Sequence, residues 1–557
     1  MIWKSFLDDQ SMMKKEEGMS IRLKIENEIR RRGEYHARQT SLFVDYYRIR
    51  LRTAYPLPIR AIHIPDFKVR EDFRSDYPWS IWMTWALEER MACLGVMAER
   101  FGSTECLEIF LRDLDGLASW PVYRQFERPD LALGHSSRTL WRSCRRKVDI
   151  PEALRQKIRS AFSRIAEDGL ALSAKNYGSF RTKHDVLTME RPFEAVHNIP
   201  IIGTIGAALA AHEIGHPGQG VLNSRLKIIL EALLDLRPAG VNDGVAYDGY
   251  VLDFMADWFE ILPDSERSVF YDHPRFNDFL EQTYRLSVPG DAVLVAPLGD
   301  VEPFEMTFHL SAQAKLQNLK PDPVRAWHLN RCDPAKLRAE ALAFLLTAPS
   351  VGEKVPLAGL LEAHGATVLR QSWDANDLAV VVSGNNSPMG HIHFDAGSIL
   401  IGVRGKWWIT DPGYQQYLHT REREFTVGPT AHNAPVINGI SQNRKGMKLI
   451  RRETQGGSLS VELDITDCYP PEIHLSKVRR RVWLEKDWVI VCDLVQEENV
   501  ESVRYHWHGH PEMGWGYESP WAFLYHPDDP NASLWVTSPQ TQIEELGISR
   551  LPGSRGQ

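Results

Sequence analysis

The chain is poor in closely spaced cysteines. Its 557 residues include six cysteines, all far apart in the sequence: Cys93, Cys106, Cys144, Cys332, Cys468 and Cys492. None of them forms a C-x-x-C pair. Zinc ribbons need such pairs, and disulfide frameworks belong to short secreted chains that are dense in cysteine. The sequence therefore predicts neither kind of scaffold.

Long apolar runs are also absent. The N-terminus contains no apolar segment typical of a signal peptide, and no stretch is long and apolar enough to cross a bilayer. We therefore expect no membrane insertion and a cytoplasmic location. Met19 is an alternative start of the chain. If the N-terminus is misassigned, a periplasmic or secreted location stays open.

An excess of positive charge is missing as well. The formal net charge is −8, with 65 Lys and Arg against 73 Asp and Glu. This balance argues against a nucleic-acid binder but leaves room for a local basic groove that holds an acidic glycan. Hydrophobic residues make up 43% of the chain and charged residues 25%, as in ordinary soluble proteins. Because 557 residues are too many for one hydrophobic core, we expect two or more domains.

Helical periodicity dominates the chain up to about residue 345. Apolar residues recur at helical spacing in several segments: 79–101, 152–165, 201–211, 226–236, 247–262 and 334–346. Proline and glycine separate these segments, which predicts helical pairs joined by short loops.

The pattern changes near residues 348–358. Short runs with strand character follow, separated by turn residues: 366–370, 378–382, 398–403, 407–410, 459–465, 478–484 and 488–494. We therefore expect an α+β multidomain chain, with a helical domain at 1–350 and a β domain at 351–557. The C-terminus shows no clear closing strand, so an incomplete β domain stays open.

Polar residues are densest in the β domain. The segment H-x-H-F-D-A-G-S begins at His391, and His393 points to the same side if the segment is extended. D-P-G-Y begins at Asp411, and T-A-H-N contains His432. Two histidines and one carboxylate with an open position are a known zinc arrangement. The alternative is that these side chains only satisfy backbone groups at a sheet edge.

Two further polar elements open helices in the first domain. His197 and Asn198 stand just before an apolar helix, where Asn198 could simply cap the helix amides. The element D-G-x-x-Y-x-x-Y runs from Asp243 to Tyr250, and its tyrosines Tyr247 and Tyr250 share one helix face. Packing in the core is the alternative interpretation of these tyrosines.

Together, these motifs and their order resemble the heparinase II/III superfamily of polysaccharide lyases. The resemblance implies an N-terminal incomplete (α/α) toroid followed by a C-terminal antiparallel β-sandwich, with the glycan in the cleft between them. It implies cleavage of a uronic-acid-containing glycan by β-elimination, which leaves a 4,5-unsaturated uronate. It implies an acidic polysaccharide or oligosaccharide as partner and no organic cofactor. A homo-oligomer stays open.

The resemblance also assigns roles to residues. Tyr247 matches the family's acid or base, with Tyr250 as the packing alternative. His197 or Asn198 matches the group that neutralises the uronate carboxylate, and His391 matches the second catalytic residue. A structural Zn²⁺, bound by some members of the family, would be held by His393, Asp411 and His432. Residues expected to contact substrate are Tyr250, Tyr414 and Arg421. The family is typically exported, and this chain shows no export signal.

Chemistry agrees with these roles. The C5 proton of a uronate is weakly acidic because its carboxylate resists further negative charge. Donors on the carboxylate stabilise that charge, and a positioned side chain then removes the proton. Paired carboxylates, as used for hydrolysis, are not needed.

Other functions compete with a lyase. The segment His212–His216 matches the H-E-x-x-H motif of zinc proteases, but Gly215 and Pro217 weaken the turn that would bring both histidines together. A glycoside hydrolase would need two carboxylates, with Asp243 and Asp248 as candidates. A non-catalytic glycan-binding protein on the same scaffold is the third alternative.

Two clusters are expected to play no catalytic part. The histidines of the segment 506–510 alternate along a predicted strand, where an exposed edge is favoured over a metal site. The basic run 142–147 is expected to be a solvated helix end.

Overall fold

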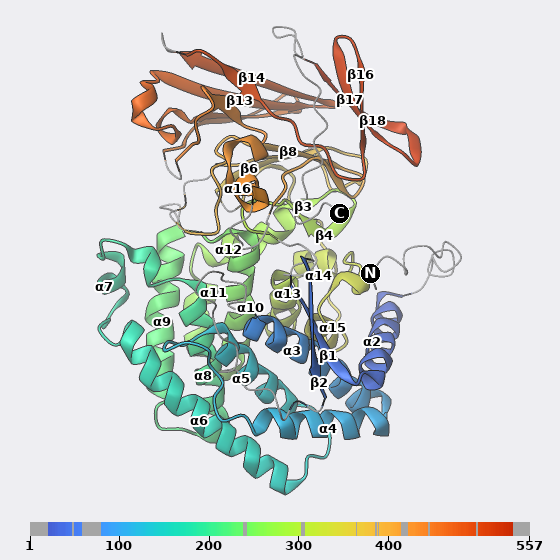
Figure 1. Cartoon of the computed structure of the whole chain (residues 1–557), viewed down its shortest axis with the longest axis vertical. Helices are drawn as coiled ribbons and strands as arrows, with labels where there is room; N and C mark the ends of the chain where they lie inside the picture. The colour runs from blue at the N-terminus through green and yellow to red at the C-terminus, as the bar shows by residue number, and fades with distance from the viewer. Residues whose placement is uncertain are drawn as a thin grey trace.

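The structure, a computed structural model, has a helical N-terminal part and a C-terminal part built of antiparallel sheets (Figure 1). The described residues are 20–46, 49–57, 59, 79–237, 242–301, 307–363, 365–384, 387, 389–413, 421–443, 446–496 and 500–537. Within this part of the chain, no helix is long and apolar enough to cross a membrane.

Helices make up most of the N-terminal part. They are α2 (Ile21–Arg38), α3 (Trp79–Phe101), α4 (Thr104–Ala118), α5 (Leu131–Cys144), α6 (Glu152–Tyr177), α7 (Lys183–Leu187), α8 (Asn198–Ile214), α9 (Gln219–Leu236), α10 (Gly244–Ile261), α11 (Asp264–Tyr271), α12 (Phe276–Arg285), α13 (Phe308–Leu319), α14 (Pro323–Leu329) and α15 (Ala339–Leu345). Two hairpins accompany them: β1 (Ser41–Tyr46) with β2 (Ile49–Pro56), and β3 (Ser287–Val288) with β4 (Asp291–Val295).

The apolar helix α8 lies at the centre of this domain. It packs against α5, α6, α9 and α10, and α10 also packs against α13. Almost every residue of α8 and α10 is buried, which explains why their apolar residues surround the whole helix rather than one face. The predicted segment 201–211 lies inside α8, and the predicted segment 247–262 runs from the first turn of α10 to one residue past its end.

The predicted helix over 334–346 is wrong in one respect. Pro334–Lys336 form a short 3₁₀ turn, Leu337 and Arg338 are extended, and α15 begins only at Ala339. The guanidinium of Arg32 on α2 accounts for the break, because it donates to the carbonyl of Leu337 at 2.8 Å and to that of Ala335 at 2.9 Å. A continuous helix would use these carbonyls for its own ladder.

The strands of the second domain form a sandwich. One sheet has the order β5 (Gly359–Ala363), β6 (Ala366–Arg370), β7 (Ala379–Val382), β8 (Ile399–Val403) and β9 (Lys406–Ile409), and the other has the order β11 (Lys448–Gln455), β12 (Ser458–Asp464), β13 (Lys477–Glu485) and β14 (Trp488–Gln496). Neighbouring strands are antiparallel in both sheets. Val380 and Trp408 of the first sheet share a core with Val461 and Val482 of the second.

Smaller elements complete this domain. They are α16 (Arg421–Val427), the pair β10 (Pro435–Ile437) and β15 (Val503–Tyr505), and the three-stranded sheet β16 (Gly514–Glu518), β17 (Trp521–His526) and β18 (Asp529–Thr537). The expected fold, a helical toroid followed by an antiparallel β-sandwich, is confirmed. A division at residue 350 stays a prediction; it would fall between Leu345, where α15 ends, and Gly359, where β5 begins.

Balanced charges are buried in the centre of the helical domain. Arg138 on α5 donates to Glu88 at 2.5 Å, to Asp253 at 2.5 Å and to Asp257 at 3.3 Å. Lys315 on α13 lies 2.8 Å from Asp253 and 2.7 Å from Asp257. These side chains hold α10 between α3, α5 and α13, and each charge has an opposite partner, as buried charges require.

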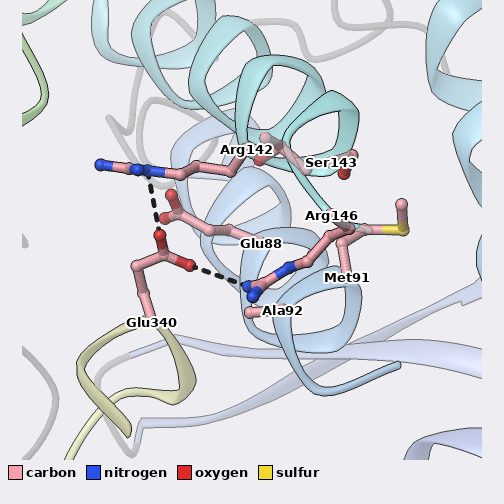
Figure 2. Close-up of a pocket in the computed structure, with 8 residues that line it drawn as sticks. Glu88, Met91, Ala92, Arg142, Ser143, Arg146 and Glu340 are labelled. Carbon is pink, nitrogen blue, oxygen red and sulfur yellow. Dashed lines mark ion pairs between the residues drawn. The ribbon is translucent and has the colours of Figure 1, made fainter. Parts of the chain in front are cut away.

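The basic run at the end of α5 is only partly solvated: Arg145 and Lys147 are exposed, as expected, whereas Arg142 and Arg146 are half-buried. Figure 2 shows Arg142 and Arg146 both directed at Glu340 of α15, at 3.1 Å and 3.8 Å. Arg142 also pairs with Asp257 and Glu260. Arg142 and Arg146 are half-buried because their charge partners come from distant segments. Spacing along the sequence does not reveal such partners.

Arg138→Met should destabilise the helical domain by about 3–5 kcal/mol, because it leaves the buried carboxylates of Glu88 and Asp253 without their guanidinium. Urea unfolding followed by circular dichroism measures this loss. Arg159→Met on the exposed side of α6 is the matched control and should change stability by at most about 0.5 kcal/mol. A loss below about 1 kcal/mol for Arg138→Met would contradict the assigned role.

Candidate active site

The two domains meet at the loop between β7 and β8. The backbone N–H of Asp300, in the loop after β4, donates to the carbonyl of His391 at 2.8 Å. The backbone N–H of Asn242, just before α10, donates to Ser387 Oγ at 3.2 Å. Gly299 has a φ of +72°, and a Cβ there would lie 2.3 Å from the His391 carbonyl oxygen. Glycine is therefore required for this close approach.

Tyr247 and His391 stack across this interface. Their ring centroids lie 3.5 Å apart and their planes differ by 8°. Tyr247 is in the first turn of α10 and is only 6% exposed. The ring of His197 lies 6.2 Å from that of His391. The structure thus brings together three of the predicted catalytic residues, two from the helical domain and one from the β domain.

Asn198 is the first residue of α8 and is 1% exposed. Neither its amide nitrogen nor its amide oxygen has a hydrogen-bond partner among the described residues. The capping interpretation of Asn198 is wrong, because the N-cap is His197, whose Nδ1 accepts from the backbone N–H of Ile199 at 3.3 Å. A buried amide without a partner at a helix N-terminus is suited to receive an anionic group.

The two histidines have opposite electrostatic surroundings. Burial, with smaller effects from His391 and Arg128, lowers the pKa of His197 to about 3, so this imidazole is neutral. Burial would also lower the pKa of His391, but the carboxylates of Asp243 and Asp300 outweigh it and raise that pKa above its usual value. His391 therefore holds its proton more tightly than an ordinary histidine.

Asp243 is a member of the cluster that the motifs did not assign to catalysis. It is 4% exposed, and neither carboxylate oxygen has a hydrogen-bond partner among the described residues. One ligand atom each of His197, Asp243 and His391 lie within 4.8 Å of one another. Burial raises the pKa of Asp243 to about 6, against the opposing effect of His391 and with help from Asp248 and Asp300.

A second cluster lies beside the first. His393, Asp411 and His432 are buried, and one ligand atom of each lies within 4.8 Å of the others. His432 Nδ1 lies 2.6 Å from Asp411 Oδ2. His393 Nδ1 and His432 Nε2 have no hydrogen-bond partner among the described residues. Two orphaned imidazole nitrogens next to a carboxylate fit the donor set of a zinc ion.

Asp300 connects the two clusters. Its carboxylate accepts from His391 Nδ1 at 3.1 Å and from His393 Nε2 at 2.8 Å. Arg423 Nη1 on α16 donates to the same carboxylate at 2.8 Å. These contacts hold the pKa of Asp300 well below its usual range in spite of burial.

Of the three residues predicted to contact substrate, Tyr250 is not supported by its position, and the other two stay predictions. Tyr250 is 0% exposed, stacks on Phe308 and bonds to His135 and Trp85 inside the helical domain, so its position does not fit contact with a glycan. Tyr414 lies outside the described residues, as does the side chain of Arg421.

The competing histidine motifs form no metal cluster within the described residues. His212 lies in α8, but Gly215 ends that helix with a φ of 65°, and His216 lies beyond it. His216 Nδ1 accepts from the backbone N–H of Gly218 at 3.0 Å. The predicted strand over 506–510 is wrong: β15 ends at Tyr505, and His508 Nε2 lies 2.8 Å from the carbonyl of Thr430.

Access to the cluster is narrow in the described structure. The side chain of His391 keeps 12% of its surface exposed, while Tyr247 and Asn198 are buried. The segments 302–306 and 414–420 and residues 385, 386 and 388 lie outside the described set. The expected cleft between the domains therefore stays a prediction.

The comparisons with known proteins agree with this architecture. Residues 358–550 match the family described as heparinase II/III-like, C-terminal. No curated protein sequence matches the chain. A crystal structure of heparinase III is similar with 12% identity, a TM-score of 0.54, and coverage of 80% of this chain and 70% of that one. The heparan sulfate lyase HepC from Pedobacter heparinus is similar with 13% identity, a TM-score of 0.52, and coverage of 90% and 78%.

Identities this low show a shared fold and carry no activity over to this chain. The family match covers the β domain, which holds the H-x-H-F-D-A-G-S, D-P-G-Y and T-A-H-N motifs. The similar structures extend the likeness to most of the helical domain. The β domain thus matches the heparinase II/III-like C-terminal family, and the chain shares its overall fold with heparinase III and HepC.

Proposed function

We propose that this protein is a polysaccharide lyase that cleaves a uronic-acid-containing glycan by β-elimination. The observation that supports this most is the stacking of Tyr247 on His391, with His197 and Asn198 beside them. A tyrosine, a histidine and a carboxylate-binding group are the three parts that the reaction needs. The names of the two similar structures are consistent with this reaction type.

Recognition of the uronate falls to the N-terminus of α8. Removing the C5 proton places additional negative charge on the uronate carboxylate. The orphaned amide of Asn198 and the positive end of the α8 dipole can both stabilise that charge. His197 is neutral, so it can contribute a hydrogen bond without adding charge.

Proton transfer is divided between Tyr247 and His391. The raised pKa of His391 favours its protonated form, which can donate to O4 as the C4–O4 bond breaks. Tyr247, stacked on that ring, is then assigned to the removal of the C5 proton in its deprotonated form, so that the phenolate oxygen takes the proton and becomes the phenol. The electrons of the C5–H bond form the C4–C5 double bond, and O4 leaves with the proton from His391.

Hydrolysis is less consistent with the carboxylates. Asp248 Oδ2 accepts from Arg237 at 2.8 Å, and Asp248 Oδ1 accepts from the backbone N–H of Asp243 at 3.1 Å. Both carboxylate oxygens of Asp248 therefore accept hydrogen bonds that stabilise the start of α10. Asp243 alone does not supply the pair of carboxylates that hydrolysis requires.

We also propose that His393, Asp411 and His432 hold one zinc ion. The orphaned nitrogens of His393 and His432 support this, because buried imidazoles without partners are costly. The bond from His393 Nε2 to Asp300 is the outer contact that metal-binding histidines usually make. Bound there, the ion would hold the β-domain loops together.

Tyr247→Phe should lower kcat by at least about 10²-fold while leaving the fold intact, because only the hydroxyl is lost. A panel of uronate polysaccharides, followed by ultraviolet absorbance of the 4,5-unsaturated product, measures this. Tyr250→Phe, one turn further along α10, is the control and should keep kcat within a few-fold, since its hydroxyl serves only the helical core.

Two outcomes would contradict the lyase proposal. Cleavage that produces reducing ends without the ultraviolet chromophore would indicate a hydrolase. Full activity in Tyr247→Phe would remove Tyr247 from the proton transfer.

Protein purified without chelators should contain about one equivalent of zinc per chain by elemental analysis. His393→Ala and His432→Ala should each lose most of that zinc, because each removes a ligand. His184→Ala, exposed on α7, is the matched control and should keep it. Zinc that persists in both ligand variants would place the ion elsewhere.

Asp243→Asn should stabilise the protein above pH 6 and have little effect near pH 4. The pKa of Asp243 is about 6 in the fold, against an ordinary value of 3.8. The native state therefore holds this proton more tightly, and stability falls as the pH rises through that window, by at most about 3 kcal/mol. Asparagine carries no charge and avoids this loss. Thermal unfolding of both proteins at pH 4 to 8 measures it; a constant difference across that range would contradict the prediction.

A further inference from the structure

Asp300 occupies an unusual position for a loop carboxylate. It follows β4 in the helical domain, yet its side chain is 0% exposed and bonds only to side chains of the β domain among the contacts described above. One oxygen, Oδ2, lies 3.1 Å from His391 Nδ1, and the other, Oδ1, lies 2.8 Å from His393 Nε2. Each histidine thus has its own carboxylate oxygen.

These contacts assign the protons on the two imidazoles. An ionised carboxylate only accepts hydrogen bonds, so His391 Nδ1 and His393 Nε2 must both be donors. The Nε2 of His391 is then the nitrogen that we assign to the reaction. His393 is left with Nδ1, the nitrogen that has no partner among the described residues and belongs to the candidate zinc cluster.

Arg423 compensates the negative charge of Asp300 in the buried interface. Its Nη1 lies 2.8 Å from Asp300 Oδ1 and its Nη2 lies 3.4 Å from Oδ2. A two-pronged guanidinium contact fixes the plane of the carboxylate as well as compensating its charge. The direction of both imidazole bonds is therefore set by one rigid group.

We propose that Asp300 is a positioning residue that couples the zinc ligand His393 to the reacting imidazole of His391. Both imidazoles bond to this one carboxylate, so a His393 held in place by zinc keeps the carboxylate aligned for its hydrogen bond to His391. Occupancy of the zinc site thereby holds His391 in its reactive orientation without any contact between the ion and the substrate. The His391 half rests on the proposed lyase function, and the His393 half does not.

Asp300→Asn tests the coupling with little change in volume. Its single amide oxygen can accept from one imidazole but not from both. We expect zinc affinity, measured by competition with a chromophoric chelator, to fall by about 10–100-fold, as for other outer contacts of metal ligands. We expect kcat to fall by a similar factor with KM nearly unchanged, because the residue does not touch the substrate.

Asp291→Asn is the matched control. Asp291 starts β4, the strand that precedes the Asp300 loop, and pairs with Lys336 at 2.6 Å. This variant should keep both zinc affinity and kcat. Circular dichroism of all variants verifies the fold, and Asp300→Ala is added only if Asp300→Asn retains native secondary structure.

A double cycle that combines zinc removal with Asp300→Asn measures the coupling between the zinc site and His391. Chelation of zinc from the wild-type protein should lower kcat, and the same treatment of Asp300→Asn should lower it by a much smaller factor, because the connection is already broken. Equal factors would mean independent effects and would overturn the proposal. Unchanged zinc affinity in Asp300→Asn, or reduced affinity with unchanged kcat, would overturn it as well. A wild-type protein that binds zinc but cleaves no uronate glycan would instead refute the proposed function, whereas the zinc titration would still decide the His393 half.

Discussion

The contact of Asp300 with two histidines is the constraint on which the candidate site depends. Asp300 belongs to the helical domain, and His391 and His393 belong to the β domain. The adjacent backbone contact, from the Asp300 N–H to the His391 carbonyl, fixes the same loop from the other side. The relative position of the domains and the orientation of the His391 imidazole are thus set by the same few atoms. A site assembled across an interface in this way requires a rigid helical partner.

That rigidity comes from buried polar contacts rather than from apolar packing alone. Arg138 and Lys315 pair with the carboxylates of Asp253 and Asp257 on α10. Tyr247 is one turn before Tyr250 on the same helix, so the network fixes the rotation of α10 and with it the ring that stacks on His391. Broken pairs in such a network are costly, which favours one arrangement of the helices.

Local patterns predicted much of this structure, and distant partners explain the rest. Hydrophobic periodicity predicted α3 and β6 with their observed bounds. It could do so because the burial of a helix or strand determines the spacing of its apolar residues. The order of the β-domain motifs predicted that His393, Asp411 and His432 converge, and the structure places one ligand atom of each within 4.8 Å of the others. Asp300 carries no such signal, since its three partners lie more than 90 residues away. Tyr250 and Tyr247 share a spacing but face different neighbours, which spacing alone cannot distinguish.

The charges of the site determine which group would meet the uronate in the proposed reaction. His391 lies beside two carboxylates, Asp243 and Asp300, so its proton is already compensated and offers little net attraction to an anion. His197 is neutral. Attraction must therefore come from the N-terminus of α8, where the buried amide of Asn198 has no partner among the described residues. An unsatisfied buried amide costs about 1–3 kcal/mol in the free protein. In the proposed reaction, a uronate carboxylate that accepts from this amide recovers the cost on binding, which would add affinity for an acidic sugar.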